Sequence, residues 1–121
     1  MKDIFLIGIG GMSGSILRYL INKNISHIYD SFPIGTFAVN IIGCLLAGIL
    51  FKYLSLNKDI NVELSLFLIV GFCGGFTTFS AFTIDSISLF NEKKFMLFFS
   101  YTILSSILGI LFCYIGMSII K

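Results

Sequence analysis

The residues best suited to chemistry in this sequence lie in one short stretch, GFCGGFTTFS at positions 71–80. An adjacent glycine pair, an adjacent threonine pair and a serine fall at the centre of a long apolar segment. Glycines alone could serve close helix packing, but buried hydroxyls beside them favour a helix that is broken into two halves. The ends of such half-helices bind ions, because free carbonyls attract cations and free amides attract anions. The stretch therefore predicts a break near Gly74–Ser80 that forms an ion site.

Two phenylalanines follow the predicted break, Phe79 and Phe82, one helical turn apart and so on one face. One interpretation is ordinary packing in the core or against lipid, which suits a chain with 14 phenylalanines. The other uses the ring quadrupole, whose positive edge attracts a small anion in a narrow path. Residue types alone leave both interpretations open.

Further polar side chains occur inside apolar stretches, where each needs a partner or a pathway. Asn40 is either a helix–helix contact or a donor to a permeating ion. Tyr101 and Ser105 share a helix face at four-residue spacing and could extend a polar track. Arg18 lies near the end of its stretch and could extend to the interface, and Asp85 could face an aqueous vestibule.

Other chemistry is not indicated. The three cysteines, Cys44, Cys73 and Cys113, lie in apolar stretches without metal-like spacing, so we expect neither a disulfide nor a cysteine metal site. The lone histidine, His27, is expected on a loop surface. With no histidine in a span, no cysteine beside a base and no paired carboxylates, we expect no enzyme, no organic cofactor and no nucleic-acid partner.

The elements that must position these residues are four apolar stretches. The chain has 121 residues, 57% hydrophobic and 12% charged, with a mean hydropathy of +1.02, whereas soluble domains average about 25% charged residues. The stretches cover residues 4–21, 34–54, 64–90 and 95–120, each near or above the roughly 20 residues that span a bilayer. They predict an all-α, multi-pass membrane protein whose single transmembrane domain covers 1–121. Lys2 and Asp3 give the first stretch no positive flank and Arg18 lies inside it, so it is interpreted as a retained span, not a signal peptide.

Positive charges are balanced between the two sides that four crossings would create. One side carries Lys2, Lys52, Lys58 and Lys121, and the other carries Arg18, Lys23, Lys93 and Lys94. Because lysine and arginine normally set insertion direction, this balance indicates either a weak bias or insertion in both orientations. Both-way insertion implies antiparallel pairs, and a transport path is most easily built between copies of so small a bundle.

Three segments resemble the fluoride channels of the Fluc (CrcB) family. They are GIGGMSGSILRY in the first stretch, GTFAVNIIGC in the second and GFCGGFTTFSAF in the third. The resemblance covers the whole chain, and its last two segments are highly specific. It implies an antiparallel, dual-topology homodimer of four-helix subunits in the plasma or inner membrane, surrounded by lipid, with two fluoride pores and a structural sodium ion at its centre.

The resemblance also implies roles for individual residues. Backbone carbonyls of Gly74 and Thr77 would hold the sodium ion. The fluoride pore would be lined by Phe79, Phe82, Asn40, Ser80, Tyr101 and Ser105. Supporting roles would fall to Arg18, Thr78 and Thr36. The chain departs from the family at Ala81, where members often carry threonine or serine, which puts any polar contact from that position in doubt.

The implied function is passive export of cytoplasmic fluoride, which lowers its toxicity. The alternative is a small multidrug-type exporter, also a four-helix dual-topology dimer, but that class needs a glutamate in its first span to exchange protons. The first stretch here has no acid beyond Asp3 at its edge, and the chain has no tryptophan. A non-transporting assembly subunit would explain the glycines and leave Asn40, Thr77 and Thr78 without purpose.

Overall fold

The computed structural model describes residues 1–28, 31–57 and 62–121, and every regular element in these ranges is helical. Four spans are long and apolar enough to cross a membrane: Lys2–Ile28, Ile34–Leu56, Val62–Asn91 and Phe95–Ile119. The first is α1 (Lys2–Ile25), which continues past the apolar stretch and ends in the 3₁₀ turn η1 (Ser26–Ile28). Lys58, one of the charges counted above, lies outside the described residues.

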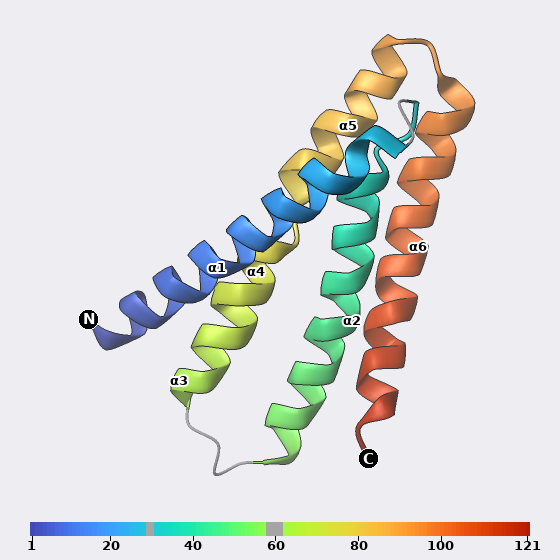
Figure 1. Cartoon of the computed structure of the whole chain (residues 1–121). Coiled ribbons are helices and arrows are strands. Elements are labelled where there is room, and N and C mark those ends of the chain that lie inside the picture. The colour runs from blue at the N-terminus through green and yellow to red at the C-terminus, as the bar shows by residue number, and fades with distance from the viewer. Residues whose placement is uncertain (29–30, 58–61) are drawn as a thin grey trace.

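The third span is not one continuous α-helix (Figure 1). It begins with α3 (Val62–Ser65), continues as the π-helical segment η2 (Leu66–Cys73) and ends its first half with α4 (Gly74–Phe76). The backbone then becomes extended at Thr77 (ψ 155°) and Thr78 (φ −149°, ψ 115°) before α5 (Phe79–Asn91) starts. The break therefore falls inside the predicted interval Gly74–Ser80.

The spans pack as two pairs, and glycines bring the two members of each pair close together. In Figure 1, α2 (Ile34–Leu56) runs beside α6 (Phe95–Ile119), and α1 crosses the first half of the third span. A Cβ added at Gly48 of α2 would collide with the Cys113 carbonyl of α6, and one added at Gly14 of α1 would collide with the Phe72 carbonyl of η2. These contacts have no room for a methyl group, as expected where small residues bring membrane helices together.

Substitution of these glycines tests the packing. We expect Gly48→Ala and Gly14→Ala each to lower the free energy of unfolding by about 1–3 kcal/mol, since backbone atoms must move to admit the methyl group. Gly8→Ala is the matched control, because nothing lies within 4 Å of the added Cβ and alanine favours the helix. Thermal unfolding in detergent measures the difference. Equal midpoints for Gly8→Ala and Gly48→Ala would contradict the close contact between α2 and α6.

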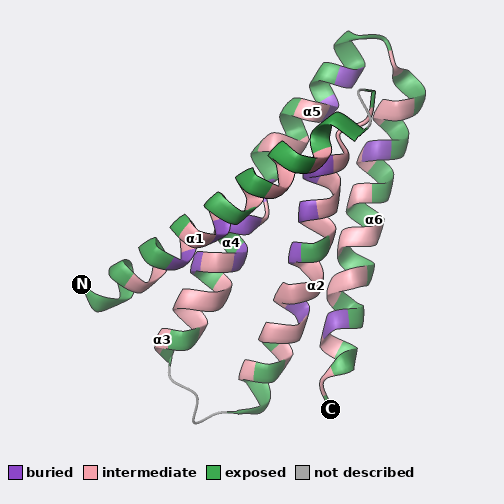
Figure 2. Cartoon of the chain, viewed as in Figure 1, coloured by how far each residue is buried: buried purple, intermediate pink, exposed green. Residues whose placement is uncertain are grey.

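Few side chains are buried within the single chain (Figure 2). Val39, Phe76 and Tyr101 are the largest that are fully buried, and they lie in α2, α4 and α6. Large apolar side chains are exposed along all four spans, with Phe79 at 78% and Ile110 at 75%. An apolar outer surface of this kind suits lipid or a second membrane subunit.

Candidate functional site

Threonine side chains add hydrogen bonds on both sides of the break in the third span. Thr77 N–H and the Thr77 hydroxyl both donate to the Cys73 carbonyl, at 2.9 and 2.8 Å, and so complete the end of the first half. Thr78 is the N-cap of α5, and its Oγ1 accepts from the Ala81 N–H at 3.1 Å. The adjacent threonines therefore end one half-helix and begin the next, as hydroxyl residues do at helix ends.

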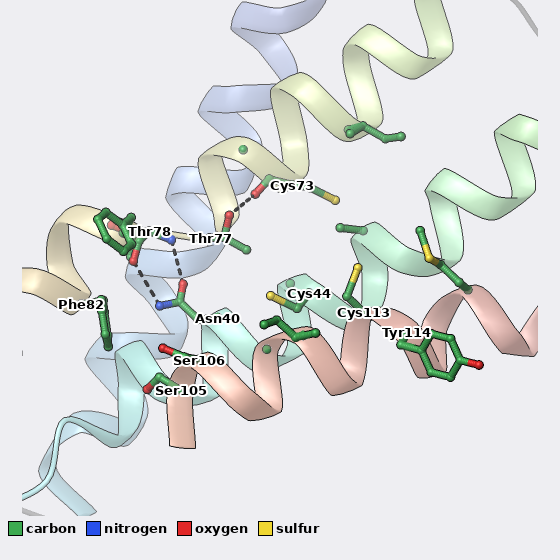
Figure 3. Close-up of a pocket in the computed structure, with 18 residues that line it drawn as sticks. Asn40, Cys44, Cys73, Thr77, Thr78, Phe82, Ser105, Ser106, Cys113 and Tyr114 are labelled. Atoms are coloured by element: carbon green, nitrogen blue, oxygen red, sulfur yellow. Dashed lines mark hydrogen bonds between the residues drawn. The ribbon is translucent and has the colours of Figure 1, made fainter. Parts of the chain in front are cut away.

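Asn40 of α2 fixes the extended backbone from the side. Its Oδ1 accepts from Thr78 N–H at 2.8 Å, and its Nδ2 donates to the Thr78 carbonyl at 3.1 Å (Figure 3). Both polar backbone groups of the least helical residue are thus satisfied by one amide, which is what a break at membrane depth requires. The amide retains a second Nδ2 hydrogen that can be donated. Asn40 also lines a pocket beside the break. Its predicted contact with fluoride stays a prediction.

A pocket of about 840 Å³ opens beside the break, between α2, the third span and α6 (Figure 3). Seven of the eleven residues predicted to form the site lie in its wall: Asn40, Gly74, Thr77, Thr78, Phe79, Phe82 and Ser105. Four others, Arg18, Thr36, Ser80 and Tyr101, are not among its lining residues. Ser80 lies at the edge of the break, where its hydroxyl is 3.2 Å from that of Thr78.

The phenylalanines begin a row of aromatic rings. The centroids of Phe79 and Phe82 are 5.6 Å apart, and Phe82 lies 5.3 Å from Tyr101 of α6. Phe32 continues the row, 5.5 Å from Tyr101 and edge-on to it. Phe79 is largely exposed at the start of α5, whereas Tyr101 is completely buried. The row therefore runs from the break in the third span, past the buried Tyr101, to Phe32 just before α2.

Three helices meet at the Tyr101 hydroxyl. It donates to Asp85 Oδ2 of α5 at 3.3 Å, and the Thr36 side chain of α2 lies close to it. Thr36 is 8% exposed, so this polar group is enclosed. Asp85 was noted in the sequence without a partner, because only the fold brings it to Tyr101, 16 residues away. The contact links the polar residues predicted in α6 to the middle of α5.

One hydroxyl in the pocket wall has no partner. Ser105 Oγ is buried without a hydrogen bond to any described residue, and it lies on the pocket side of α6 (Figure 3). Most other serines and threonines of the spans bond a carbonyl of their own helix, as Ser86 and Ser106 do. An unpartnered buried hydroxyl is costly unless an ion or water occupies the pocket. Arg18 Nε is also buried and bonds nothing in the described part of the chain, but it lies outside this pocket.

The break also frees carbonyl oxygens of the kind that bind hard cations. In a continuous helix, Gly74 C=O would accept from Thr78 N–H, which here bonds Asn40 instead. Likewise Thr77 C=O would accept from Ala81 N–H, which here bonds Thr78 Oγ1. The two residues predicted to hold sodium have therefore lost their usual carbonyl partners, and both line the pocket. Such oxygens suit an alkali cation, because unwound backbone carbonyls and the C-terminal ends of half-helices coordinate sodium in membrane proteins.

Comparisons with known proteins point to one family. The family described as CrcB-like protein, Camphor Resistance (CrcB), matches residues 5–117. The chain belongs to the CrcB-like family. Its similar relatives include a protein of Flavobacterium psychrophilum named a fluoride-specific ion channel, 44% identical over all of this chain and 98% of that protein. Proteins of the same name from Bacteroides fragilis (48% identical, 92% of this chain and 90% of that protein) and Aquifex aeolicus (39%, 96% and 94%) also match.

The match confirms the family resemblance found in the sequence and covers all four spans of this CrcB-like chain. The sequence reasoning missed two features of the site. The sequence suggested an aqueous vestibule for Asp85 and no contact with Tyr101, and it gave Gly43 no role at the break. In the structure Gly43 is the α2 residue against which the Thr77 methyl group packs, so that glycine admits the side chain that ends α4.

Proposed function

We propose that this CrcB-like protein is a passive, fluoride-selective channel that lets cytoplasmic fluoride leave the cell. One observation carries the proposal. The buried Ser105 hydroxyl, which has no partner among the described residues, and the Phe79–Phe82 pair line one pocket at a broken membrane helix. The names of the relatives, which are fluoride-specific ion channels, agree with it.

Each part of the site suits a small, strongly hydrated anion. The N-terminus of α5 directs the positive end of a helix dipole at the break. The Ser105 hydroxyl and the remaining Asn40 amide hydrogen can donate to fluoride and replace part of its water shell. Ring edges of Phe79 and Phe82 carry partial positive charge and continue the path toward Tyr101.

No energy source beyond the membrane potential is needed. Hydrogen fluoride enters cells as a neutral weak acid and ionises in the more alkaline cytoplasm, where the anion is trapped. A potential that is negative inside drives the anion out with about 2.3 kcal/mol per 100 mV. We accordingly place the protein in the plasma or inner membrane. Fluoride efflux from liposomes that hold the purified protein tests this function, with chloride efflux as the control, and equal rates for the two anions would contradict it.

We further propose that the working unit is an antiparallel homodimer with two pores. Balanced positive charges and the exposed apolar side chains of every span support it. The pocket beside the break opens to the surface of the single chain, and a second subunit would enclose it.

Charge bias tests the dual topology. Three lysines added to the NEKK turn between α5 and α6 should fix one orientation, because cationic loops stay in the cytoplasm. We expect fluoride flux to fall sharply when this variant is expressed alone. It should return on co-expression with an oppositely biased variant. Full flux from a population with a single orientation would rule out the antiparallel pair.

A structural sodium ion at the dimer centre completes the proposal. Gly74 and Thr77 of the two subunits would each contribute carbonyl oxygens, and the ion would stabilise the pairing of the two breaks. Replacing external sodium by a large organic cation should leave flux nearly unchanged at first, and prolonged depletion should inactivate or dissociate the dimer. Flux and size-exclusion elution measured over time separate the two effects. Flux that followed sodium instantaneously would indicate coupled transport instead.

A further inference from the structure

All three cysteines of the chain line the pocket beside the break, although they come from three different segments. Cys44 lies in α2, Cys73 at the end of η2 and Cys113 in α6. None forms a disulfide. Neither the fluoride path nor the proposed sodium ion uses a thiol, so the gathering of these side chains at one pocket has no role in the function proposed above.

Cys44 and Cys113 are brought together by the glycine contacts between α2 and α6. A Cβ at Gly109 would lie 3.5 Å from Cys44 Sγ, and the backbone of Cys113 packs on Gly48. Each cysteine thus faces a glycine of the other helix. Side chains of helices lean toward the N-terminus, so the Cys113 thiol leans back to the level of Gly109, where Cys44 lies. Cys44 lines the pocket together with Cys113 and Cys73 and lies within electrostatic range of both (Figure 3).

The coordination number limits which cation could bind. Among the described residues no group of three or more His, Cys, Asp or Glu side chains is placed to hold a metal ion. Zinc prefers four such ligands and calcium six or more oxygens, so neither fits. A soft cation that binds sulfur and accepts two ligands does fit, because thiolates select soft metals.

Charge then favours a divalent ion. An apolar pocket strongly disfavours an uncompensated charge. Two thiolates neutralise a divalent cation and leave a monovalent one with a net negative charge. We propose that Cys44 and Cys113 form a two-thiolate site for a soft divalent cation of the mercury(II) type, and that its occupation blocks fluoride flux. The step is a ligand exchange without redox change: HgCl₂ and two thiols give the dithiolate and two HCl.

The block follows from where the ion would lie. Cys44 is four residues after Asn40 on α2, and Gly109 is four residues after Ser105 on α6. The ion would therefore lie one helical turn, about 5.4 Å, from the polar part of the pocket and would clamp its two walls together. The block rests on the proposed function, whereas ion binding does not.

The first experiment measures binding alone. Reduced protein is loaded with HgCl₂, passed through gel filtration with excess monothiol, and assayed for mercury and for sulfur-to-mercury charge-transfer absorption. We expect a single ion per chain to be retained by the unmodified chain and by Cys73→Ser, the matched control. Cys44→Ser and Cys113→Ser should weaken binding by more than about 100-fold, since even indirect partners of a metal contribute about 10–100-fold. Equal retention by all variants, or equal loss in Cys73→Ser, would overturn the site.

The second experiment measures flux in the same preparations. Mercury should stop fluoride efflux through the unmodified chain and Cys73→Ser, and should spare the folded Cys44→Ser/Cys113→Ser double variant. Unchanged flux in protein shown to retain mercury would overturn the block and leave the binding site standing. Absence of fluoride efflux before any mercury is added would instead refute the proposed function, and the block with it, while the binding result stands on its own.

Discussion

Phe82→Ile is expected to lower fluoride flux by at least about tenfold while leaving the protein folded. Isoleucine keeps much of the apolar volume of the ring, and such exchanges usually cost less than about 1.5 kcal/mol of stability. It removes the quadrupole, however, so that fluoride meets only aliphatic hydrogen between the Phe79 ring and Tyr101. Each 1.36 kcal/mol added to that barrier slows passage about tenfold.

Phe79→Ile should act in the same way, because the two rings are 5.6 Å apart at the start of α5. Methionine at either position should do less harm, since its sulfur is polarisable and its chain flexible. Phe5→Ile is the matched control: Phe5 is 71% exposed on α1, away from the pocket. Elution from size exclusion establishes the fold, and a fluoride electrode then measures efflux from liposomes. Unchanged flux in both isoleucine variants would show that the two rings only pack against their neighbours.

Asn40→Asp is expected to have a still larger effect. The carboxylate can accept from Thr78 N–H as the amide does, so one of the two bonds at the break survives. The bond to the Thr78 carbonyl is lost, at about 1 kcal/mol of stability. A fluoride ion that passes within about 4 Å of the new charge would be repelled by about 4 kcal/mol at an effective dielectric constant near 20. That barrier corresponds to about a thousandfold loss of flux.

The effect of Asn40→Asp should depend on pH in a definite direction. A carboxyl group is neutral in acid and becomes charged as the pH rises, so the charge on the introduced side chain depends on pH. A neutral carboxyl can donate to the Thr78 carbonyl and mimic the amide. Flux through the variant should therefore be closest to normal in acid and fall as the pH rises. A variant that conducts normally at about pH 9, where even strongly shifted carboxyls are ionised, would show that Asn40 only braces the break.

The sequence was sufficient to predict the four spans and the position of the break. Apolar runs of membrane-spanning length and the GG and TT pairs are local signals, and the structure breaks the helix at Thr77 and Thr78. It could not predict the π-helical segment Leu66–Cys73. In a uniformly apolar run, no alternation of polar and apolar residues distinguishes one helical period from another.

The partners of the polar residues were also beyond the sequence. Asn40 was expected to need a partner, but its choice of both backbone groups of Thr78 depends on how α2 packs beside the break. The same is true of Asp85, which meets Tyr101 only because α5 turns back along α6. A buried polar residue in the sequence indicates that a hydrogen-bond partner is needed, whereas tertiary packing decides which group is that partner.

We propose that fluoride moves passively and carries its charge across the membrane. The voltage dependence of fluoride efflux tests this most directly. Liposomes with the purified protein would be loaded with potassium fluoride, diluted into fluoride-free buffer without a pH gradient, and followed with a fluoride electrode. We predict almost no efflux until a potassium ionophore releases the opposing potential, then rapid efflux, with chloride-loaded liposomes releasing little under the same conditions. Rapid fluoride efflux that needs a pH gradient and no ionophore would contradict the channel and indicate a proton-coupled exporter.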